Sequence, residues 1–154
     1  MTVYRLGRLT DVQQLACLRW ALRTDDSEQD DPVTKKQFMH DFVAWMIATP
    51  LTDLVHWVAE QDDQIIGVVS VRVVPMMPSP ENLNDRFGYV TNTYVLPQHR
   101  NKGIGTSLLS EVRTWALREK LELLVVWPSD RAYALYERAG YLRYSDPVVL
   151  KLRQ

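Results

Sequence analysis

The segment YVLPQHRNKGIGTSLL, residues 94–109, constrains the fold of this chain more than any other stretch. A β-rich run ends at Pro97, a basic loop follows, and Gly103 and Gly105 open a run with apolar residues at helical spacing. Glycine has no Cβ atom, so the backbone can turn tightly here and approach another group closely. The sequence therefore predicts a strand whose end lies beside the N-terminus of a helix over 103–119.

The start of that helix is a candidate site for an anion. The first N–H groups of a helix have no partner within it, and the helix dipole concentrates partial positive charge there. A pyrophosphate suits this geometry, and Arg100, Lys102 and Thr106 add positive charge and a hydroxyl donor. Neither the GxxxxGKS/T loop nor the GxGxxG fingerprint is present. A tight strand-to-helix connection that binds nothing is the competing interpretation.

The order of elements along the chain predicts a mixed sheet. Two β-rich runs at 54–60 and 64–74 are separated by a short polar turn, which indicates an antiparallel hairpin. A strand at 87–96, the helix at 103–119 and an apolar run at 121–127 follow in the pattern of a parallel crossover. The other expected elements are a strand at 3–8, helices from Thr10 to Arg23 and from Thr34 to Pro50, a helix that begins at Ser129 or Asp130, and two strands within 141–152.

These elements form an α/β (α+β) fold, a single mixed central sheet of about seven strands with about four helices packed on both faces. The chain of 154 residues is long enough for one hydrophobic core. No linker divides it, so we expect a single domain over 1–154. The capping-box pairs Thr10 with Gln13 and Thr34 with Gln37 mark the expected starts of the first two helices.

Charge and composition exclude several classes of function. Lysine and arginine total 18 against 19 acidic residues, so no overall positive field attracts nucleic acid or an anionic membrane. The single cysteine excludes an internal disulfide, and His40, His56 and His99 lack the spacing of a metal site, so no metal is expected. The apolar runs are shorter than the roughly 20 residues that span a bilayer. Because no targeting signal is evident either, we expect a cytoplasmic protein.

Two motifs resemble those of a known enzyme family. Arg100-x-x-Gly103-x-Gly105 resembles the pyrophosphate-binding motif R/Q-x-x-G-x-G/A of the GCN5-related N-acetyltransferases (GNAT). The run AYALYERAGY at 132–141 resembles the AxxLYexxGF motif of the same family. The resemblance extends to the element order over most of the chain. It implies the GNAT fold, acetyl-CoA or a related acyl-CoA as co-substrate, and acyl transfer to an amine.

The resemblance also implies roles for particular residues. Backbone amides between strand and helix would hold the pyrophosphate of the cofactor, and the pantetheine arm would pair with the strand near Val95, where a backbone N–H would polarise the thioester. The residues of this pyrophosphate loop are Arg100, Asn101, Lys102, Gly103, Ile104, Gly105 and Thr106. Tyr136 is the expected general acid, which protonates the departing thiolate. An aromatic packed in the core is the competing interpretation for Tyr136.

Two positions depart from the family pattern. Ser129 replaces an asparagine that contacts the pantetheine arm in many members, and its hydroxyl either keeps that contact or caps the following helix. Asn92 stands where an acidic residue often acts as the general base, and an amide cannot accept the proton. The identity of the base stays open between Tyr94, His99, Glu81 and a chain of water molecules.

The acceptor side is less defined by the sequence. The acidic residues within 25–31 either attract a cationic amine, such as a polyamine, an aminoglycoside or a lysine-rich peptide, or form a solvated surface loop. Asn92, Tyr94 and Trp127 are the candidate acceptor-binding residues. We expect an N-acyltransferase that acts directly on a primary amine of a small molecule or peptide, as a homodimer like many of its relatives. A sensor or partner module that binds acyl-CoA without catalysis is the alternative, motivated by Asn92.

Overall fold

The structure, a computed structural model, describes residues 1–25, 31–143 and 147–152. Within this part of the chain lies one five-stranded sheet in the order β1-β2-β3-β4-β5. Neighbouring strands are antiparallel except for the parallel pair β4 and β5, so the predicted mixed sheet is confirmed. The strands are β1 (Val3–Leu6), β2 (Leu54–Gln61), β3 (Gln64–Pro75), β4 (Arg86–Val95) and β5 (Leu124–Val125).

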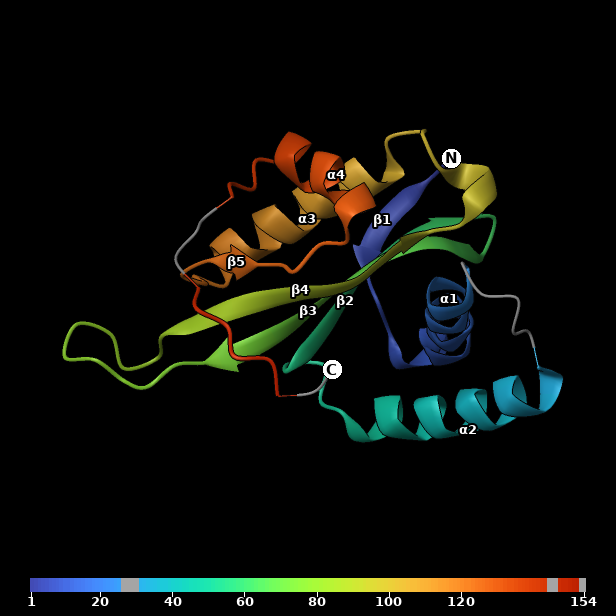
Figure 1. Ribbon diagram of the computed structural model, residues 1–154, viewed down its shortest axis with the longest axis horizontal. Coiled ribbons are helices and arrows are strands. Elements are labelled where there is room, and N and C mark those ends of the chain that lie inside the picture. Colours follow the sequence, from blue (N-terminus) through green and yellow to red (C-terminus); the bar gives the residue numbers. More distant parts are fainter. Residues whose placement is uncertain (26–30, 144–146, 153–154) are drawn as a thin grey trace.

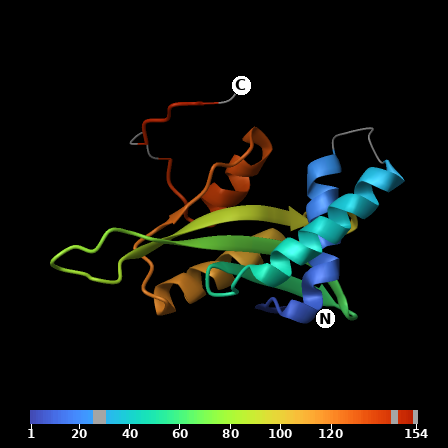
Figure 2. The ribbon, with the colours of Figure 1, turned by 90° about the horizontal axis from the view of Figure 1, so that it is seen from below.

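Among the described residues, four α-helices cover the two faces of the sheet (Figure 1). α1 and α2 lie on one face and α3 and α4 on the other, so helices cover both faces as predicted. Figure 2 shows α2 crossing α1 on the outside of their face. The helices are α1 (Val12–Thr24), α2 (Pro32–Ala48), α3 (Ile104–Arg118) and α4 (Tyr133–Arg138), with short 3₁₀ turns at η1 (Leu9–Asp11), η2 (Pro97–His99) and η3 (Asp130–Ala132).

The sheet separates two apolar cores. Val69 belongs to the core on the α3 side, where it packs with Leu108 and Val112. Its neighbour Val68 belongs to the core on the α1 side, where it packs with Leu15. Successive strand residues point to opposite faces, and because both faces are covered by helices, β2 and β3 are apolar almost throughout.

An aspartate, and not the predicted threonine, stands immediately before each of the two N-terminal helices. The Asp11 carboxylate accepts a hydrogen bond from the Arg8 N–H at 2.7 Å and forms an ion pair with Arg5, which closes the 3₁₀ turn η1. α1 begins directly after this turn, at Val12. The Asp31 carboxylate accepts from two N–H groups of the next turn, and α2 begins at Pro32. The predicted starts, Thr10 and Thr34, lie two residues from the observed first residues, Val12 and Pro32. At α1 a 3₁₀ turn precedes the helix, and at α2 aspartate caps as well as threonine does and proline favours the first helical position.

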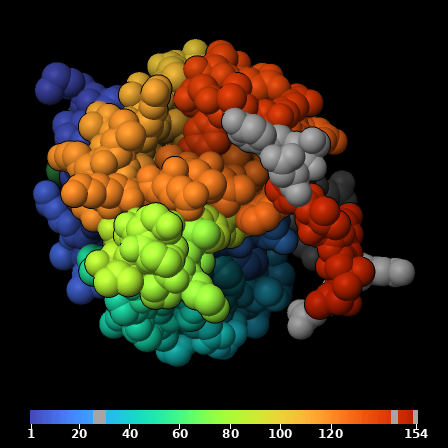
Figure 3. Space-filling view, turned by 90° about the vertical axis from the view of Figure 1, so that its left-hand side faces the viewer, coloured from blue at the N-terminus to red at the C-terminus, as the bar shows by residue number. Residues whose placement is uncertain are grey.

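The sheet has five described strands instead of the about seven predicted. β5 covers two residues of the expected 121–127, and the described parts of 141–152 form no strand. Trp127, which the apolar run places in a buried strand, is 62 % exposed. The segment 147–152 stands apart from the body of the molecule in Figure 3, and its apolar side chains are exposed. An apolar pattern becomes a strand only beside another strand, and the pattern does not specify that partner.

A β-bulge interrupts β4 near its C-terminal end. The register with β3 shifts by one residue, so that Asn92 and Thr93 lie opposite Val69 alone. Asn92 has a φ of 50°, in the left-handed region that asparagine adopts more readily than most residues. β5 pairs with β4 only at Gly88 and Tyr89, so within the described chain the second half of β4 has one edge without a neighbouring strand. This divergence leaves an opening beside the start of α3.

Candidate active site

A cavity of about 410 Å³ lies where β4 ends and α3 begins. Its walls are the end of β4, the junction between β4 and α3, the end of α1, and α4. Cavities of this size hold small-molecule ligands. The residues predicted to bind the cofactor line it with the exception of Lys102; they are Val95, Arg100, Asn101, Gly103, Ile104, Gly105, Thr106 and Ser129.

The turn into α3 uses two residues with left-handed backbone. Asn101 has a φ of 61°, and Gly103, the N-cap of α3, has a φ of 79°. Gly103 has no side chain to accept from the first N–H groups of the helix, so these donors stay available to a ligand. The dipole of this 15-residue helix adds partial positive charge at the same place. The backbone therefore fits the pyrophosphate that the sequence predicts.

The two glycines of the junction have different requirements. A Cβ atom on Gly103 would meet no protein atom within 4 Å and would project into open space, but the positive φ of this residue strains any other side chain. A Cβ on Gly105 would lie 3.4 Å from Cδ1 of Leu135, an ordinary contact. Of the two, Gly103 is required by its backbone conformation, whereas a Cβ at Gly105 fits beside Leu135 of α4.

Arg100 is held by neighbouring protein groups. Its Nη2 lies 2.5 Å from the Asp25 carboxylate, and its Nε donates to the Val95 carbonyl at 2.9 Å. The ion pair holds the pKa of Asp25 below its ordinary value. Of the predicted acidic run, Asp25 thus balances Arg100, Asp31 caps α2, and residues 26–30 lie outside the described residues. The two described ends of the run are engaged within the protein, which weakens the case for a cationic acceptor.

Tyr136 lies behind the cavity wall. Tyr136 is 5 % exposed, and its hydroxyl donates to Oγ1 of Thr93 at 2.9 Å. Thr93 is one of the residues that line the cavity, and Tyr136 is not. Burial raises the pKa of Tyr136, although the bond to Thr93 lowers it, so the phenol keeps its proton at neutral pH. The ring also packs edge-on against Tyr141, with 5.3 Å between the centroids. Tyr136 is therefore packed in the core, with its hydroxyl bonded to Thr93 of the cavity wall.

Thr93 is a site residue that the sequence analysis does not predict. The bulge directs the side chains of Thr93 and Asn92 to different sides of the sheet. The Asn92 side chain bonds to Arg19 of α1 and to Ser70 of β3, whereas Thr93 lines the cavity. The asparagine within an otherwise β-favouring run is the signal that could have indicated the bulge, since asparagine is depleted in regular strands. Without the bulge, the period of two gives no reason to place Thr93 at a cavity.

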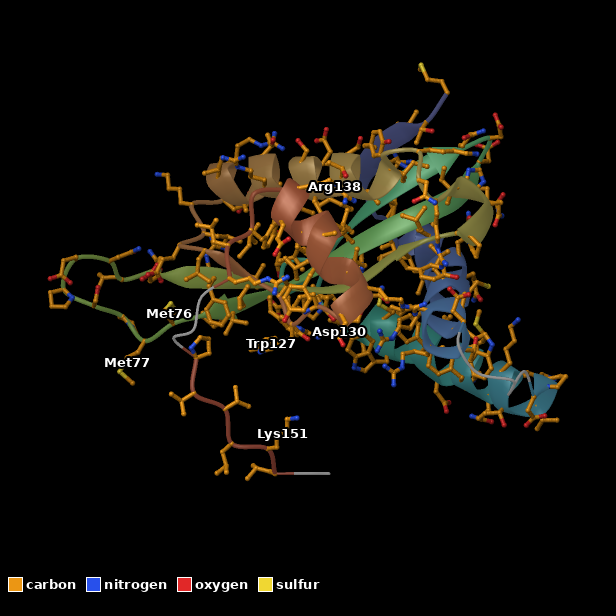
Figure 4. The ribbon with its side chains drawn as sticks, turned by 45° about the horizontal axis from the view of Figure 1, so that its top comes forward. Met76, Met77, Trp127, Asp130, Arg138 and Lys151 are labelled. Carbon is orange, nitrogen blue, oxygen red and sulfur yellow. The ribbon has the colours of Figure 1, made fainter. Side chains whose placement is uncertain are left out.

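The three candidate acceptor residues do not meet in one place. Tyr94 lines the cavity and is 5 % exposed. Asn92 faces α1, and Trp127 stands near the surface. Figure 4 shows Trp127 beside Asp130, at the opposite end of the η3–α4 segment from Arg138. All three lie toward the α1 side of the sheet, since Tyr94 belongs to the core on that side and Trp127 contacts Tyr89, but the described structure does not bring them together at one point.

The candidate bases differ in their access to the cavity. His99 and Tyr94 both line it, but burial raises the pKa of Tyr94, so its phenolate is absent at neutral pH. Glu81 lies in the loop before β4, and the ten residues of β4 separate that loop from the cavity by about 30 Å. His56, in contact with Ser70 on the α1 side, has its pKa lowered to about 4 by burial and by Arg72, so it is neutral at neutral pH.

Within 1–25, 31–143 and 147–152, no group of three or more His, Cys, Asp or Glu side chains is arranged to hold a metal ion. In the same ranges, no helix has the length and apolar character needed to cross a membrane.

Solved structures with the same fold are numerous. A predicted acetyltransferase with acetyl-CoA from Clostridium acetobutylicum is 24% identical, covers 99% of this chain and 97% of its own, and has a TM-score of 0.76. A GCN5-related N-acetyltransferase from Ralstonia eutropha is 22% identical over 98% of this chain and 99% of its own, with a TM-score of 0.75. Glucosamine-6-phosphate N-acetyltransferase from Arabidopsis thaliana is 16% identical over 99% of each chain, with a TM-score of 0.71.

These similarities establish the fold, and the match to a family model establishes the family. No curated protein sequence matches the chain at a significant level. The model of the acetyltransferase (GNAT) family matches residues 15–141, which include β4, the junction at Gly103 and the helix that carries Tyr136. Members of this family use acetyl-CoA. The chain therefore belongs to the acetyltransferase (GNAT) family and is an acetyltransferase.

Proposed function

We propose that this protein transfers an acetyl group, or a related acyl group, from acyl-CoA directly to a primary amine of a small molecule or a peptide. The observation that carries the proposal is a single cavity bounded both by an uncapped helix N-terminus and by a strand edge without a neighbouring strand in the described chain. The neighbour from Clostridium acetobutylicum, crystallised with acetyl-CoA, supports the choice of cofactor.

The backbone of the chain supplies the donors for this cofactor. We assign the pyrophosphate to the N–H groups between Arg100 and Thr106. The Leu96 N–H donates to the Ile66 carbonyl of β3 at 2.9 Å, and successive strand residues direct their backbone groups to opposite sides. The N–H and carbonyl of Val95 therefore face the free edge, where the pantetheine arm would pair with them. The bond from Arg100 Nε to that carbonyl supports this direction.

Acyl transfer needs a polarised carbonyl and a proton for the leaving group. The acyl thioester supplies the activated carbonyl, which the Val95 N–H would polarise. As the amine nitrogen bonds to the carbonyl carbon and the carbon–sulfur bond breaks, the thiolate must be protonated. The Thr93 hydroxyl lines the cavity and would give its proton to sulfur while it takes one from Tyr136, 2.9 Å away.

The attacking amine must lose a proton as well. Asn92 cannot accept it, and the raised pKa of Tyr94 keeps that phenol protonated. We assign the proton to solvent, with the imidazole of His99 on the cavity wall as a side-chain acceptor. No covalent acyl-enzyme is required, because the amine attacks the thioester directly.

Two measurements test the proposal. Titration with acetyl-CoA should raise the melting temperature of the protein, because a ligand that binds the folded state stabilises it. Thiol release from acetyl-CoA in the presence of a panel of primary amines should then exceed the rate without amine. Stabilisation without turnover on any amine would instead support the binding module without catalysis. Absence of both would refute the proposal.

The proton path has its own variants. Tyr136→Phe should lower kcat by about 10²- to 10⁴-fold, the usual contribution of a general acid. Thr93→Val should lower kcat similarly, whereas Thr93→Ser keeps the hydroxyl and should retain most of the rate. An unchanged kcat in Tyr136→Phe would remove this residue from the chemistry. Loss of activity in Tyr136→Phe alone, with Thr93→Val active, would show that the phenol acts without Thr93.

A further inference from the structure

Two arginine side chains on the α1 and α2 side of the sheet have no carboxylate partner within residues 1–25, 31–143 and 147–152. Arg19 of α1 donates through Nη1 to the Oδ1 atom of Asn92, at 3.4 Å. Arg72 of β3 lies over the ring of Trp45 of α2, with 5.8 Å between Cζ and the ring centroid. The ion pairs of the described chain involve other side chains. Both arginines are partly buried.

Tyr89 connects the two arginines. It is the β4 partner of Arg72 in the register with β3, and residues directly opposite each other share a face of the sheet. Burial and the charge of Arg23 lower the pKa of Arg19, and nearby Tyr89 partly opposes this. Arg72 in turn helps to lower the pKa of His56 on the same face. This face therefore carries positive charge that the described part of the chain does not neutralise.

A partly buried cation without a counter-charge is costly, so such a pair is suited to an anion that arrives from outside. The guanidinium group matches carboxylate and phosphate oxygens with two parallel hydrogen bonds. Trp127, which contacts Tyr89 edge-on at 5.0 Å between centroids and is 62 % exposed, adds an apolar wall that a ligand can reach. Charge and shape at this surface therefore favour a small ligand with an anionic group.

The position of these residues relates them to acyl transfer. Asn92, the partner of Arg19, is adjacent in the chain to Thr93, which lines the cofactor cavity. The cavity also reaches the side that carries Arg19, because Leu22 of α1 and Tyr94, both of the core on that side, line it. An amine on that ligand could therefore reach the acyl group while its anionic group stays on the arginines.

We propose that Arg19 and Arg72, with Asn92 between α1 and the sheet, bind an amine acceptor that also carries an anionic group, either a carboxylate or a phosphate. We call this surface the arginine face. The proposal rests on the acyl transfer proposed above and specifies its substrate class. It opposes the cationic acceptors that the acidic run suggests, and it predicts discrimination by charge.

Matched pairs of amines test the arginine face. Thiol release is measured with glucosamine and glucosamine 6-phosphate, with phenylalaninamide and phenylalanine, and with spermidine. The anionic member of at least one pair should have a kcat/KM at least about 10-fold higher than its neutral member, because a hydrogen bond between charged groups contributes that much or more. The sugar pair reports a phosphate site and the amino-acid pair reports a carboxylate site.

Variants connect this preference to the two arginines. Arg19→Gln and Arg72→Gln should each lower kcat/KM for the anionic amine by about 10- to 100-fold and change the value for the neutral amine little. Arg118→Gln removes the same charge at the exposed end of α3, on the other face of the sheet, and should leave both values unchanged. Equal losses for the anionic and neutral amines would overturn the proposal, because they would show a general structural role.

Calorimetric titration of the same amines into the protein saturated with CoA separates this proposal from the proposed function. Preferential binding of an anionic amine, lost in Arg19→Gln, without thiol release would refute acyl transfer and retain the arginine face. Thiol release with equal kcat/KM in each pair, or with a preference for spermidine, would overturn the arginine face alone. Neither thiol release nor preferential binding of an anionic amine would overturn both.

Discussion

Replacement of Gly103 by alanine tests whether the start of α3 binds the cofactor. Gly103 has a φ of 79°, and an added Cβ would meet no protein atom within 4 Å. Gly140, which follows α4 and does not line the cavity, has a φ of 90° and equally open surroundings. Gly140→Ala is therefore a matched control, because both substitutions impose the same backbone strain and neither creates a clash within the protein.

The strain of a left-handed alanine is about 1–2 kcal/mol, so each variant should lose about that much stability and melt about 2–8 °C lower. Only Gly103→Ala places a methyl group where phosphate oxygens would approach the first N–H groups of α3. Loss of one hydrogen bond to a charged oxygen corresponds to a Kd for CoA about 10- to 100-fold higher. Gly140→Ala should leave the Kd unchanged.

The assay is calorimetric titration of each variant with CoA, below the melting temperature of both. Thermal melts without ligand establish that the two proteins are destabilised to the same degree. Equal Kd values for the parent protein and Gly103→Ala, together with the expected loss of stability, would refute the assignment of the pyrophosphate. A weaker Kd in both variants would show that strain, and not the position of the methyl group, controls binding.

Three further predictions concern other parts of the molecule. The unfolding free energy should fall by about 3 kcal/mol as the pH decreases from 6.5 to about 4, because His56 binds a proton in the unfolded chain but not in the folded one. Urea unfolding of His56→Gln should lack this decrease. If the decrease persisted in His56→Gln, His56 would not be its source. Gly88→Ala should cost about 1–3 kcal/mol in chemical denaturation, since its Cβ would lie 2.6 Å from Leu124 and 2.8 Å from Val71, and an unchanged midpoint would refute this packing. Asp25→Asn should tighten CoA binding by up to about fivefold at low salt, because it frees the charge of Arg100 from an exposed ion pair; weaker binding would show that Asp25 positions Arg100.

The parts of the fold that depend on local pattern follow from the sequence. The hairpin of β2 and β3, the strand β4 and the helix α3 have bounds within a residue or two of those predicted, because strong periodicity and clear turn signals define them. The junction at Gly103 could be predicted for the same reason, since a glycine between a strand and a helix is a local requirement. This junction also carries the resemblance that indicates the family.

The features that depend on distant partners could not be predicted. The run 121–127 is apolar throughout, yet only Leu124–Val125 pairs, because β4 diverges from it. The role of Thr93 depends on a bulge whose register involves β3. The pairing of Arg100 with Asp25 joins residues 75 positions apart. Each of these contacts depends on how separate elements pack together. A period of 2 or 3.6 residues shows which residues share a face of one element, but not which other element packs against that face.

The extra residue in β4 has a consequence for how such a protein can change over time. Asn92 and Thr93 together lie opposite one residue of β3, so these adjacent side chains point to different compartments of the site. Asn92 lies beside α1, and Thr93 lies beside the cofactor cavity. Mutations at Asn92 and its contacts can therefore alter which compound is acylated while the machinery shared by all substrates is left intact. A deletion of one residue here would regularise the ladder and couple the two compartments, so that neither could vary alone.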